Sequence, residues 1–384
     1  MTIKKDSNLI IHEVKRGIEN ITKILLFSRA AGRCEICNEL VIKDKFTNSD
    51  VLFGEMAHIY AFSPGGARSK NDKLYNNDIR NLLLACSTCH TKIDKAKQVQ
   101  YYSAELLLER KRRHENRIKL VTGFNDQRQT KVLKMKANIN GELVNISDQD
   151  IVKGLIKEKN FPSEEKFEEI DFSNVSGSND KIYWEQKKKE ILQLMADFYS
   201  NLKRDKIEHV SVFGMGPMPL LMYLGSQINN KVKTQFFQRH RDGDGWSWPN
   251  NKLTAAYKFR KIQNGKNKNK VTLLLSLSGF VNKKLLPPKI SDYYIYELYL
   301  SSADPNYNFL RSEADLFNFK KEFTTAISKI KNLHKSLIQI DVFPAVPAPV
   351  AIICGESLNK NSDPTLAVYN TSLGGKFKYA LKIN

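Results

Sequence analysis

The segment VFGMGPMP at residues 212–219 is matched by the segment VFPAVPAP at residues 342–349. Both begin with Val-Phe and end with Pro-x-Pro, and each is followed by six residues that end in a glycine, Gly225 or Gly355. The two copies are offset by 130 residues throughout, without a gap. Each copy is typical of a buried strand, a tight turn and an apolar helix that begins at the second proline and stops at the glycine.

Further strands and helices are predicted around both copies. Strands are expected at 233–239, 271–277, 293–300 and 365–369, and helices at 184–202 and 312–334. Strands that alternate with helices favour an α/β fold, so we expect two related α/β halves. In such sheets ligands bind at the carboxyl ends of the strands, and two related halves would therefore enclose a pseudo-symmetric pocket.

Candidate ligand-binding residues lie in the loops at these strand ends and beside them. Aromatic side chains can stack on bases, whereas arginine and exposed backbone N–H groups can hold phosphates. For one of the two tryptophans, packing onto the neighbouring sheet is an equally good interpretation. The candidates are Gly216, Pro217, Arg239, Trp246, Trp248, Tyr257, Ser278, Gly279, Ala345, Val346 and Tyr369.

This half of the chain resembles the SAVED domain, a sensor built from two fused CARF-like, Rossmann-like α/β halves. The likeness spans about 185–384 and is carried by the repeat, by WSW at 246–248 and by AVYN at 367–370. The resemblance implies that the domain binds cyclic oligonucleotides made by CD-NTase enzymes.

Four of the five cysteines form two pairs of equal spacing, CEIC at 34–37 and CSTC at 86–89. Two such pairs predict a tetrahedral zinc site formed by Cys34, Cys37, Cys86 and Cys89. Four thiolates leave no open position, so this zinc would be structural. Four unrelated buried cysteines and a thioredoxin-like redox pair are the weaker interpretations.

A second group of residues lies between and after the cysteine pairs. A predicted strand at 53–59 contains His58, the segment NLLLAC at 81–86 begins with Asn81, and His90 directly follows the last cysteine. This order resembles the HNH endonuclease family over about residues 28–100, and it implies a zinc-stapled ββα-metal fold. Taken singly, Asn81 could be a turn residue and His90 a helix-start residue beside the zinc.

The resemblance implies a role for each of these residues. His58 would be the general base, Asn81 would orient the base and its loop, and His90 would bind Mg²⁺ or another divalent ion. Asp94 lies one helical turn after His90 and could be a second ligand. The sequence departs from the family pattern at Ala57, where many members have a metal ligand; Glu55 could substitute for it, or His58 could itself be a ligand.

The chain carries 61 Lys and Arg residues against 41 Asp and Glu residues, a net charge of +20 over 384 residues. Such a surplus favours a polyanionic partner, although a lysine-rich proteome would produce it too. Arg112 and Arg113 in a basic helical segment, and Arg68 after a glycine loop, are the candidate DNA contacts. The sequence shows neither a secretory signal nor a run long enough to span a membrane, so we expect a soluble cytoplasmic protein.

These features predict three regions. Residues 1–121 would form the HNH domain with its four-cysteine zinc site, and 181–384 the sensor domain with its repeat. Residues 122–180 would be a connecting region that contains a β-hairpin around Asn140-Gly141, a strong turn signal. This hairpin could instead belong to the second domain as an added edge.

An HNH nuclease fused to a SAVED sensor resembles an effector of CBASS, a bacterial anti-phage system. The resemblance implies a double-stranded DNA endonuclease that a cyclic di- or oligonucleotide activates. Our own expectation, for which the sequence shows no interface, is a homodimer that assembles further on activation. Two other functions stay open: a ligand-independent restriction-type nuclease whose second domain reads DNA, and a zinc-dependent nucleic-acid-binding regulator. The repeat favours the ligand-activated endonuclease over both of these alternatives, because it predicts a two-fold ligand pocket.

Overall fold

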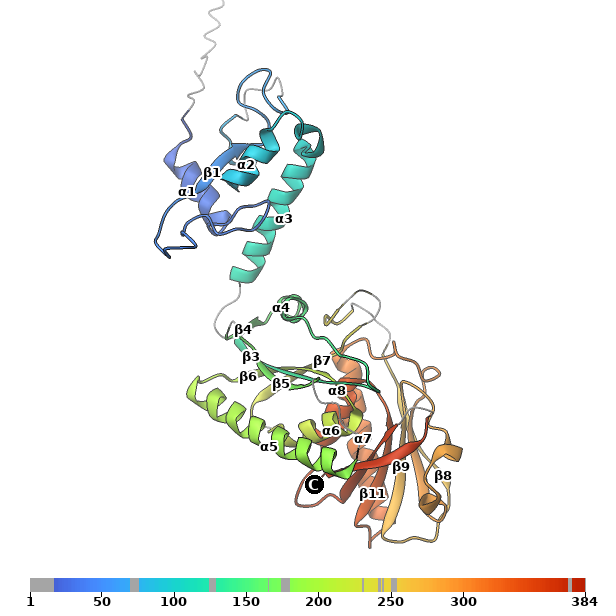
Figure 1. Ribbon diagram of the computed structural model, residues 1–384. Coiled ribbons are helices and arrows are strands. Elements are labelled where there is room, and N and C mark those ends of the chain that lie inside the picture. Colours follow the sequence, from blue (N-terminus) through green and yellow to red (C-terminus); the bar gives the residue numbers. More distant parts are fainter. Residues whose placement is uncertain are drawn as a thin grey trace, which may run out of the picture. The chain divides into compact units, whose positions relative to one another are not determined.

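The computed structural model describes residues 17–69, 76–123, 129–164, 166–173, 180–229, 231–240, 243, 245–249, 254–371 and 375–383. The chain divides into two units, Met1–Phe124 and Asn125–Asn384 (Figure 1). Among the described residues, no helix is long and apolar enough to cross a membrane.

The first unit is built around an antiparallel pair of strands followed directly by a helix. Strands β1 and β2 pair so that Glu55 lies opposite Ala85, and Cys86, the last residue of β2, caps the helix α2. The helices α1 and α3 pack near this ββα arrangement, and α3 begins at the Ser103 cap. The elements are α1 (Asn20–Arg29), β1 (Gly54–His58), β2 (Leu82–Cys86), α2 (Ser87–Asp94) and α3 (Ala104–Thr122).

The second unit contains two sheets. In its described residues, the first sheet has the order β4-β3-β6-β7 with β5 paired to β3, and the second has the order β13-β12-β11-β9-β10-β8. The strands of the first sheet are β3 (Gln129–Ala137), β4 (Phe161–Pro162), β5 (Glu168–Phe172), β6 (His209–Met215) and β7 (Lys233–Phe237). Those of the second are β8 (Tyr257–Gln263), β9 (Lys270–Ser276), β10 (Tyr294–Leu300), β11 (Gln339–Ala345), β12 (Thr365–Thr371) and β13 (Phe377–Ile383).

The two sheets share one topology. The order β7-β6-β3-β5 in the first corresponds to β12-β11-β9-β10 in the second, and every pairing within these two sets is parallel. The helices correspond as well: α5 precedes β6 as α7 precedes β11, and α6 follows β6 as α8 follows β11. The helices are α4 (Asp148–Lys157), α5 (Lys181–Arg204), α6 (Met218–Gln227), α7 (Glu313–Leu333) and α8 (Ala348–Glu356). The prediction of two related α/β halves is therefore confirmed, while the antiparallel edge strands β8 and β13 were not predicted.

The helices α6 and α8 cross each other with their backbones in contact. A Cβ atom on Gly225 would lie 1.8 Å from the carbonyl oxygen of Ile352, and one on Gly355 would lie 1.8 Å from that of Met222. These contacts are related by the same offset of 130 residues as the repeat. Both glycines lie inside their helices, so the expectation that they stop the helices is wrong; they are needed for the close approach.

The connecting region predicted at 122–180 is also corrected by the structure. Strand β3 lies between β5 and β6, with a parallel pairing to each, so this segment belongs to the sheet of the second unit. Asn140 and Gly141 do form a tight turn with positive φ, yet only the bridge between Ile139 and Glu142 closes it. The predicted hairpin is short because β3 forms its ladders with strands far away in the sequence.

Gly225→Ala and Gly355→Ala are each expected to lower the free energy of unfolding by about 3 kcal/mol or more, because the new methyl group would overlap a carbonyl oxygen of the crossing helix. Urea denaturation of the full chain measures this change. The matched control is Gly279→Ala, where an added Cβ has no atom within 4 Å. Equal stability of all three variants would contradict the inferred role of the crossing.

Candidate functional site

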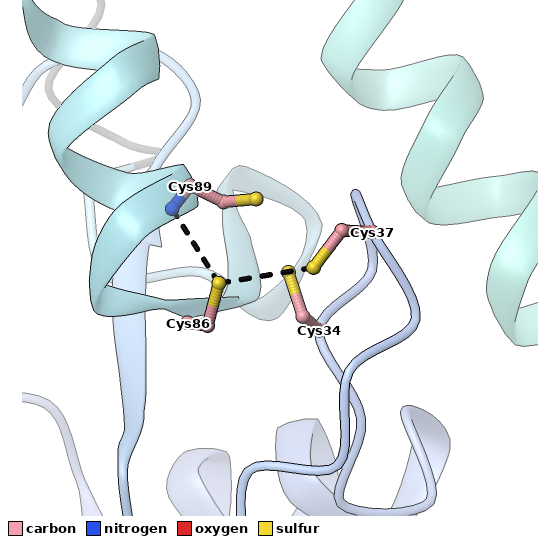
Figure 2. Close-up of side chains that lie close together, drawn as sticks. All are labelled: Cys34, Cys37, Cys86 and Cys89. Atoms are coloured by element: carbon pink, nitrogen blue, oxygen red, sulfur yellow. Dashed lines mark hydrogen bonds between the residues drawn. The ribbon is translucent and has the colours of Figure 1, made fainter.

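Four cysteine side chains converge from two distant segments of the first unit, as Figure 2 shows. Cys34 and Cys37 lie in the loop after α1, Cys86 ends β2, and Cys89 lies in the first turn of α2. Their sulfur atoms all lie within 4.8 Å of one another, and none is in a disulfide. In the described part of the chain, no other group of three or more His, Cys, Asp or Glu residues is this compact.

The geometry of the four cysteines fits a zinc ion. Sγ of Cys37 and Sγ of Cys86 are 3.8 Å apart, and thiolates bound tetrahedrally to zinc at ~2.3 Å are also about 3.8 Å apart. Burial, followed by repulsion from neighbouring sulfurs, raises the pKa of Cys89. Four thiolates this close therefore need a cation, and the site leaves no open position for substrate.

Glu35 joins the first cysteine pair to the rest of the unit. Its Oε2 accepts a hydrogen bond from the backbone N–H of Leu84 at 2.7 Å, and its Oε1 lies 3.7 Å from Nζ of Lys111 on α3. Burial raises the pKa of Glu35 to about 7, against the attraction of Lys111. Sequence reasoning missed this link, because Glu35 is only a spacer in the cysteine motif.

Glu55, His90 and Asp94 lie in a row, with one carboxylate at each ring nitrogen of His90. Nδ1 of His90 is 2.5 Å from Oε2 of Glu55, and Nε2 is 3.5 Å from Oδ2 of Asp94. Hydrogen bonding to Asp94, and then to Glu55, raises the pKa of His90 to about 9 against the effect of burial. The structure thus brings these three predicted residues together, although not as a compact metal group.

The row can accept a divalent ion with a small adjustment. Two donor atoms bound side by side to one Mg²⁺ are about 3 Å apart, so Glu55 and Nδ1 of His90 would have to separate by about 0.5 Å. The ion would then replace the proton that the two groups share. The side chain of Glu55 is 45% exposed, which leaves room for this movement.

His58 ends β1, and its partner is a residue that sequence reasoning missed. Nε2 of His58 is 3.1 Å from Oδ1 of Asn77, and the side-chain amide of Asn77 in turn donates to Gly17 O at 3.4 Å. With Oδ1 as acceptor, Nε2 carries the hydrogen and Nδ1 is the ring nitrogen that can take up a proton. Asn77 lies in a polar loop with no spacing signal that would have identified it.

Asn81 is buried and holds the loop that follows His58. Its Oδ1 accepts from the N–H of Tyr60 at 2.8 Å, and its Nδ2 donates to Tyr60 O at 2.9 Å and to Asn76 O at 3.2 Å. Its carbonyl oxygen also accepts from Ile59 N. The side chain thus joins the beginning and the end of the loop that follows His58.

The predicted DNA contacts divide into two kinds. Arg112 and Arg113 are exposed on α3 and are free to meet a phosphate backbone. Arg68 is not: its side chain is 6% exposed and donates to Asp94 and to the carbonyl oxygens of Ile59 and Ile93. The expectation that Arg68 contacts DNA phosphate is therefore wrong, because its donors are used inside the protein.

A cavity of about 740 Å³ lies in the second unit at the carboxyl ends of β6 and β11. Both copies of the repeat line it through their turns, which precede α6 and α8. Six predicted residues line the cavity: Gly216, Arg239, Ser278, Gly279, Ala345 and Val346. Further lining residues that sequence reasoning missed are Ile139, Gln238, His240, Tyr307, Asn308 and Thr371.

The cavity is lined by polar groups from both halves of the second unit. Arg239 has the one permanent charge among its lining residues, and it is held by Asp150 at 3.3 Å and by the ring of Trp246 at 5.8 Å. Oγ of Ser278 and Oε1 of Gln238 are buried without a hydrogen-bond partner in the described structure. A polar ligand would satisfy both atoms, as buried polar groups require.

The tryptophans predicted as base platforms are buried instead. Trp246 is 1% exposed and packs edge-on against Phe213, with ring centres 5.2 Å apart. Trp248 packs edge-on against His240 at 5.7 Å. Their loop composition suggested exposure, but large aromatic rings gain more by burial against the sheet. Trp246 contacts Arg239 and Trp248 contacts His240, so both tryptophans pack against residues that line the cavity.

Three other predicted ligand residues also lie outside the cavity. The hydroxyl of Tyr257 donates to Asp315 O at 3.0 Å, and that of Tyr369 donates to Oδ2 of Asp341 at 2.9 Å, so both rings are core residues. Pro217 is buried as the N-cap of α6. The exposed aromatic residue that does line the cavity is Tyr307.

One cavity shared by two related α/β halves, with a few converging polar groups, is the architecture of a ligand-binding domain. The model of the "SMODS-associated and fused to various effectors sensor domain", SAVED, matches residues 191–383, which is half of the chain. The chain therefore belongs to the SAVED family, and its second unit is a sensor domain.

Solved structures of Cap4 SAVED/CARF-domain containing receptors are similar to the chain. The Acinetobacter baumannii receptor with the cyclic trinucleotide 2'3'3'-cAAA is 14% identical with a TM-score of 0.46, over 72% of this chain and 56% of that chain. The Moraxella osloensis receptor is 13% identical with a TM-score of 0.42, over 73% and 58%. The chain thus spans little more than half of these receptors. No curated protein matches it.

Cys86→Ser is expected to abolish stoichiometric zinc binding and to unfold the first unit, because one of the four zinc ligands is lost while serine can still cap α2. Zinc content by atomic absorption and the thermal unfolding profile measure both effects. The control is Cys354→Ala, a buried cysteine of α8 outside the cluster, which should keep one zinc ion per chain. Full zinc content in Cys86→Ser would rule out the four-cysteine site.

Proposed function

We propose that this chain is a metal-dependent double-stranded DNA endonuclease, activated by a cyclic di- or oligonucleotide and acting as an effector of CBASS-type anti-phage defence. The observation that carries the proposal is the cavity formed by the turns of both repeat copies in a chain of the SAVED sensor family. A two-fold cavity suits a cyclic ligand made of repeating nucleotide units. The HNH-like arrangement in the first unit supplies the effector.

Several cavity groups support a nucleotide ligand. Arg239 supplies a positive charge for a phosphate, and Tyr307 supplies an exposed ring on which a base can stack. Each helix start contributes the N–H of its first residue, Met218 or Ala348, because the second position of each helix is a proline without an N–H. The ligand therefore meets few backbone donors and depends on these side chains.

The residues of the first unit support phosphodiester hydrolysis. His58, hydrogen-bonded to Asn77 through Nε2, would take the proton of the attacking water at Nδ1. Asn81 keeps the neighbouring loop in place, while Arg112 and Arg113 would hold the DNA backbone. Glu55 and His90 would hold a divalent ion, whose chemistry is to stabilise negative charge at the scissile phosphate.

The ligand is tested by calorimetric titration of the full chain with a panel of cyclic di- and trinucleotides. One of these compounds is expected to bind, and Arg239→Gln should weaken its binding by about 10- to 100-fold, since a charge-assisted hydrogen bond is lost. Arg204→Gln removes an exposed arginine at the end of α5 and should leave binding unchanged. Failure of every compound to bind would argue against the cyclic-nucleotide sensor.

The nuclease is tested by plasmid cleavage with Mg²⁺, with and without the same panel. Cleavage is expected only with the activating nucleotide and should fall by at least about 100-fold in His58→Ala, because the general base is removed. Sedimentation in both states shows whether a dimer assembles further on activation. Cleavage without any nucleotide would favour a restriction-type nuclease, and full activity of His58→Ala would refute the assigned base.

A further inference from the structure

Arg68 is the buried centre of a hydrogen-bond cluster beside the row formed by Glu55, His90 and Asp94. Its Nε donates to Ile59 O at 2.8 Å, its Nη1 to Ile93 O at 2.7 Å, and its Nη2 to Oδ1 of Asp94 at 2.7 Å. The side chain is 6% exposed although it carries a permanent charge. A buried arginine with this many fixed partners holds its neighbours in one geometry.

The two oxygens of Asp94 have different partners. Oδ1 accepts from Arg68, and Oδ2 faces Nε2 of His90. A carboxylate on the ring nitrogen that does not bind metal is the usual way in which proteins orient a metal-binding histidine. Asp94 therefore lies at Nε2 of the ring. On the opposite side of the ring, Nδ1 of His90 and Oε2 of Glu55 face each other and could both bind a metal ion.

The same guanidinium also holds the end of the strand that carries His58. Ile59 directly follows His58, and its carbonyl oxygen accepts the Nε hydrogen bond of Arg68. One planar and charged group thus ties the end of β1 to the end of α2. The connection helps to fix α2, which carries His90, relative to the end of β1, which carries His58.

We infer that Arg68 is a positioning residue of the endonuclease, which holds Asp94 on Nε2 of His90 and so directs Nδ1, together with Glu55, toward the divalent ion. This inference rests on the proposed nuclease function. Asp94 orients the metal-binding histidine and is not itself a ligand. The role of Arg68 differs from the phosphate contact that its place after a glycine loop predicted.

The test is Mn²⁺ binding to the zinc-loaded full chain, followed by electron paramagnetic resonance without DNA or nucleotide. Arg68→Gln should raise the dissociation constant for Mn²⁺ by about 10- to 100-fold and leave the number of ions bound per folded chain unchanged. A residue that only stabilised the fold would lower the number of sites and leave the dissociation constant as it is. His90→Ala identifies the signal of this site.

Two further variants control the measurement. Arg29→Gln removes an exposed arginine of α1 and should alter neither the affinity nor the number of sites. Arg68→Lys keeps the positive charge but replaces the planar guanidinium by an ammonium group, and it should give an intermediate affinity for Mn²⁺. If Arg68→Gln does not fold, Arg68→Lys is compared with the wild type instead. In cleavage assays, Arg68→Gln should lower kcat with an unchanged KM for DNA, whereas Arg112→Gln should raise KM.

The outcomes separate this inference from the function on which it rests. Unchanged or tighter Mn²⁺ binding in Arg68→Gln, with wild-type kcat, would overturn the positioning role and leave the nuclease in place. A raised KM with unchanged kcat would return Arg68 to the phosphate-contact role. Wild-type protein that neither binds Mn²⁺ nor cleaves DNA would overturn the proposed function, and the inference with it.

Discussion

The backbone contact between α6 and α8 is the constraint on which the second unit depends. Each helix brings a glycine to the crossing, and each glycine lies against a carbonyl oxygen of the other helix, Gly225 on Ile352 and Gly355 on Met222. Any side chain at either position would force the helices apart. Because both helices are buried along nearly their whole length, such a separation would disturb the core that the two sheets share.

The crossing also explains where the cavity lies. Only two residues separate the end of β6 from the start of α6, and the end of β11 from the start of α8, so holding the helices together brings the two strand ends and their turns face to face. The frame of the cavity is nearly two-fold, since both turns come from the repeat. The distribution of charge in the cavity is not two-fold. Arg239 and His240 belong to one half, whereas Thr371 lies at the corresponding strand end of the other half. The fold thus fixes the shape of the site, and the loops fix its chemistry.

In the first unit, the four-cysteine site is the feature that can fix the position of a helix, α2. Cys86 and Cys89 lie at the start of α2, and His90 is the next residue, so a zinc ion bound by the four cysteines would fix the position of His90. Asp94 and Arg68 then set the orientation of its ring. The four-cysteine cluster, α2 and the buried Arg68 thus surround one imidazole, at a surface where Glu55, His90 and Asp94 are each partly exposed.

The sequence by itself determined the cysteine cluster, the two α/β halves and the strand ends that form the cavity. These features follow from local spacing and from a repeat that can be read directly, because buried strands and apolar helices impose their own patterns. Only the tertiary structure decided that Trp246 and Tyr369 are core residues, that Arg68 turns inward, and that β3 joins the first sheet. Each of these outcomes depends on partners far away in the chain, and neither composition nor periodicity specifies which distant group will satisfy a ring, a charge or a strand edge.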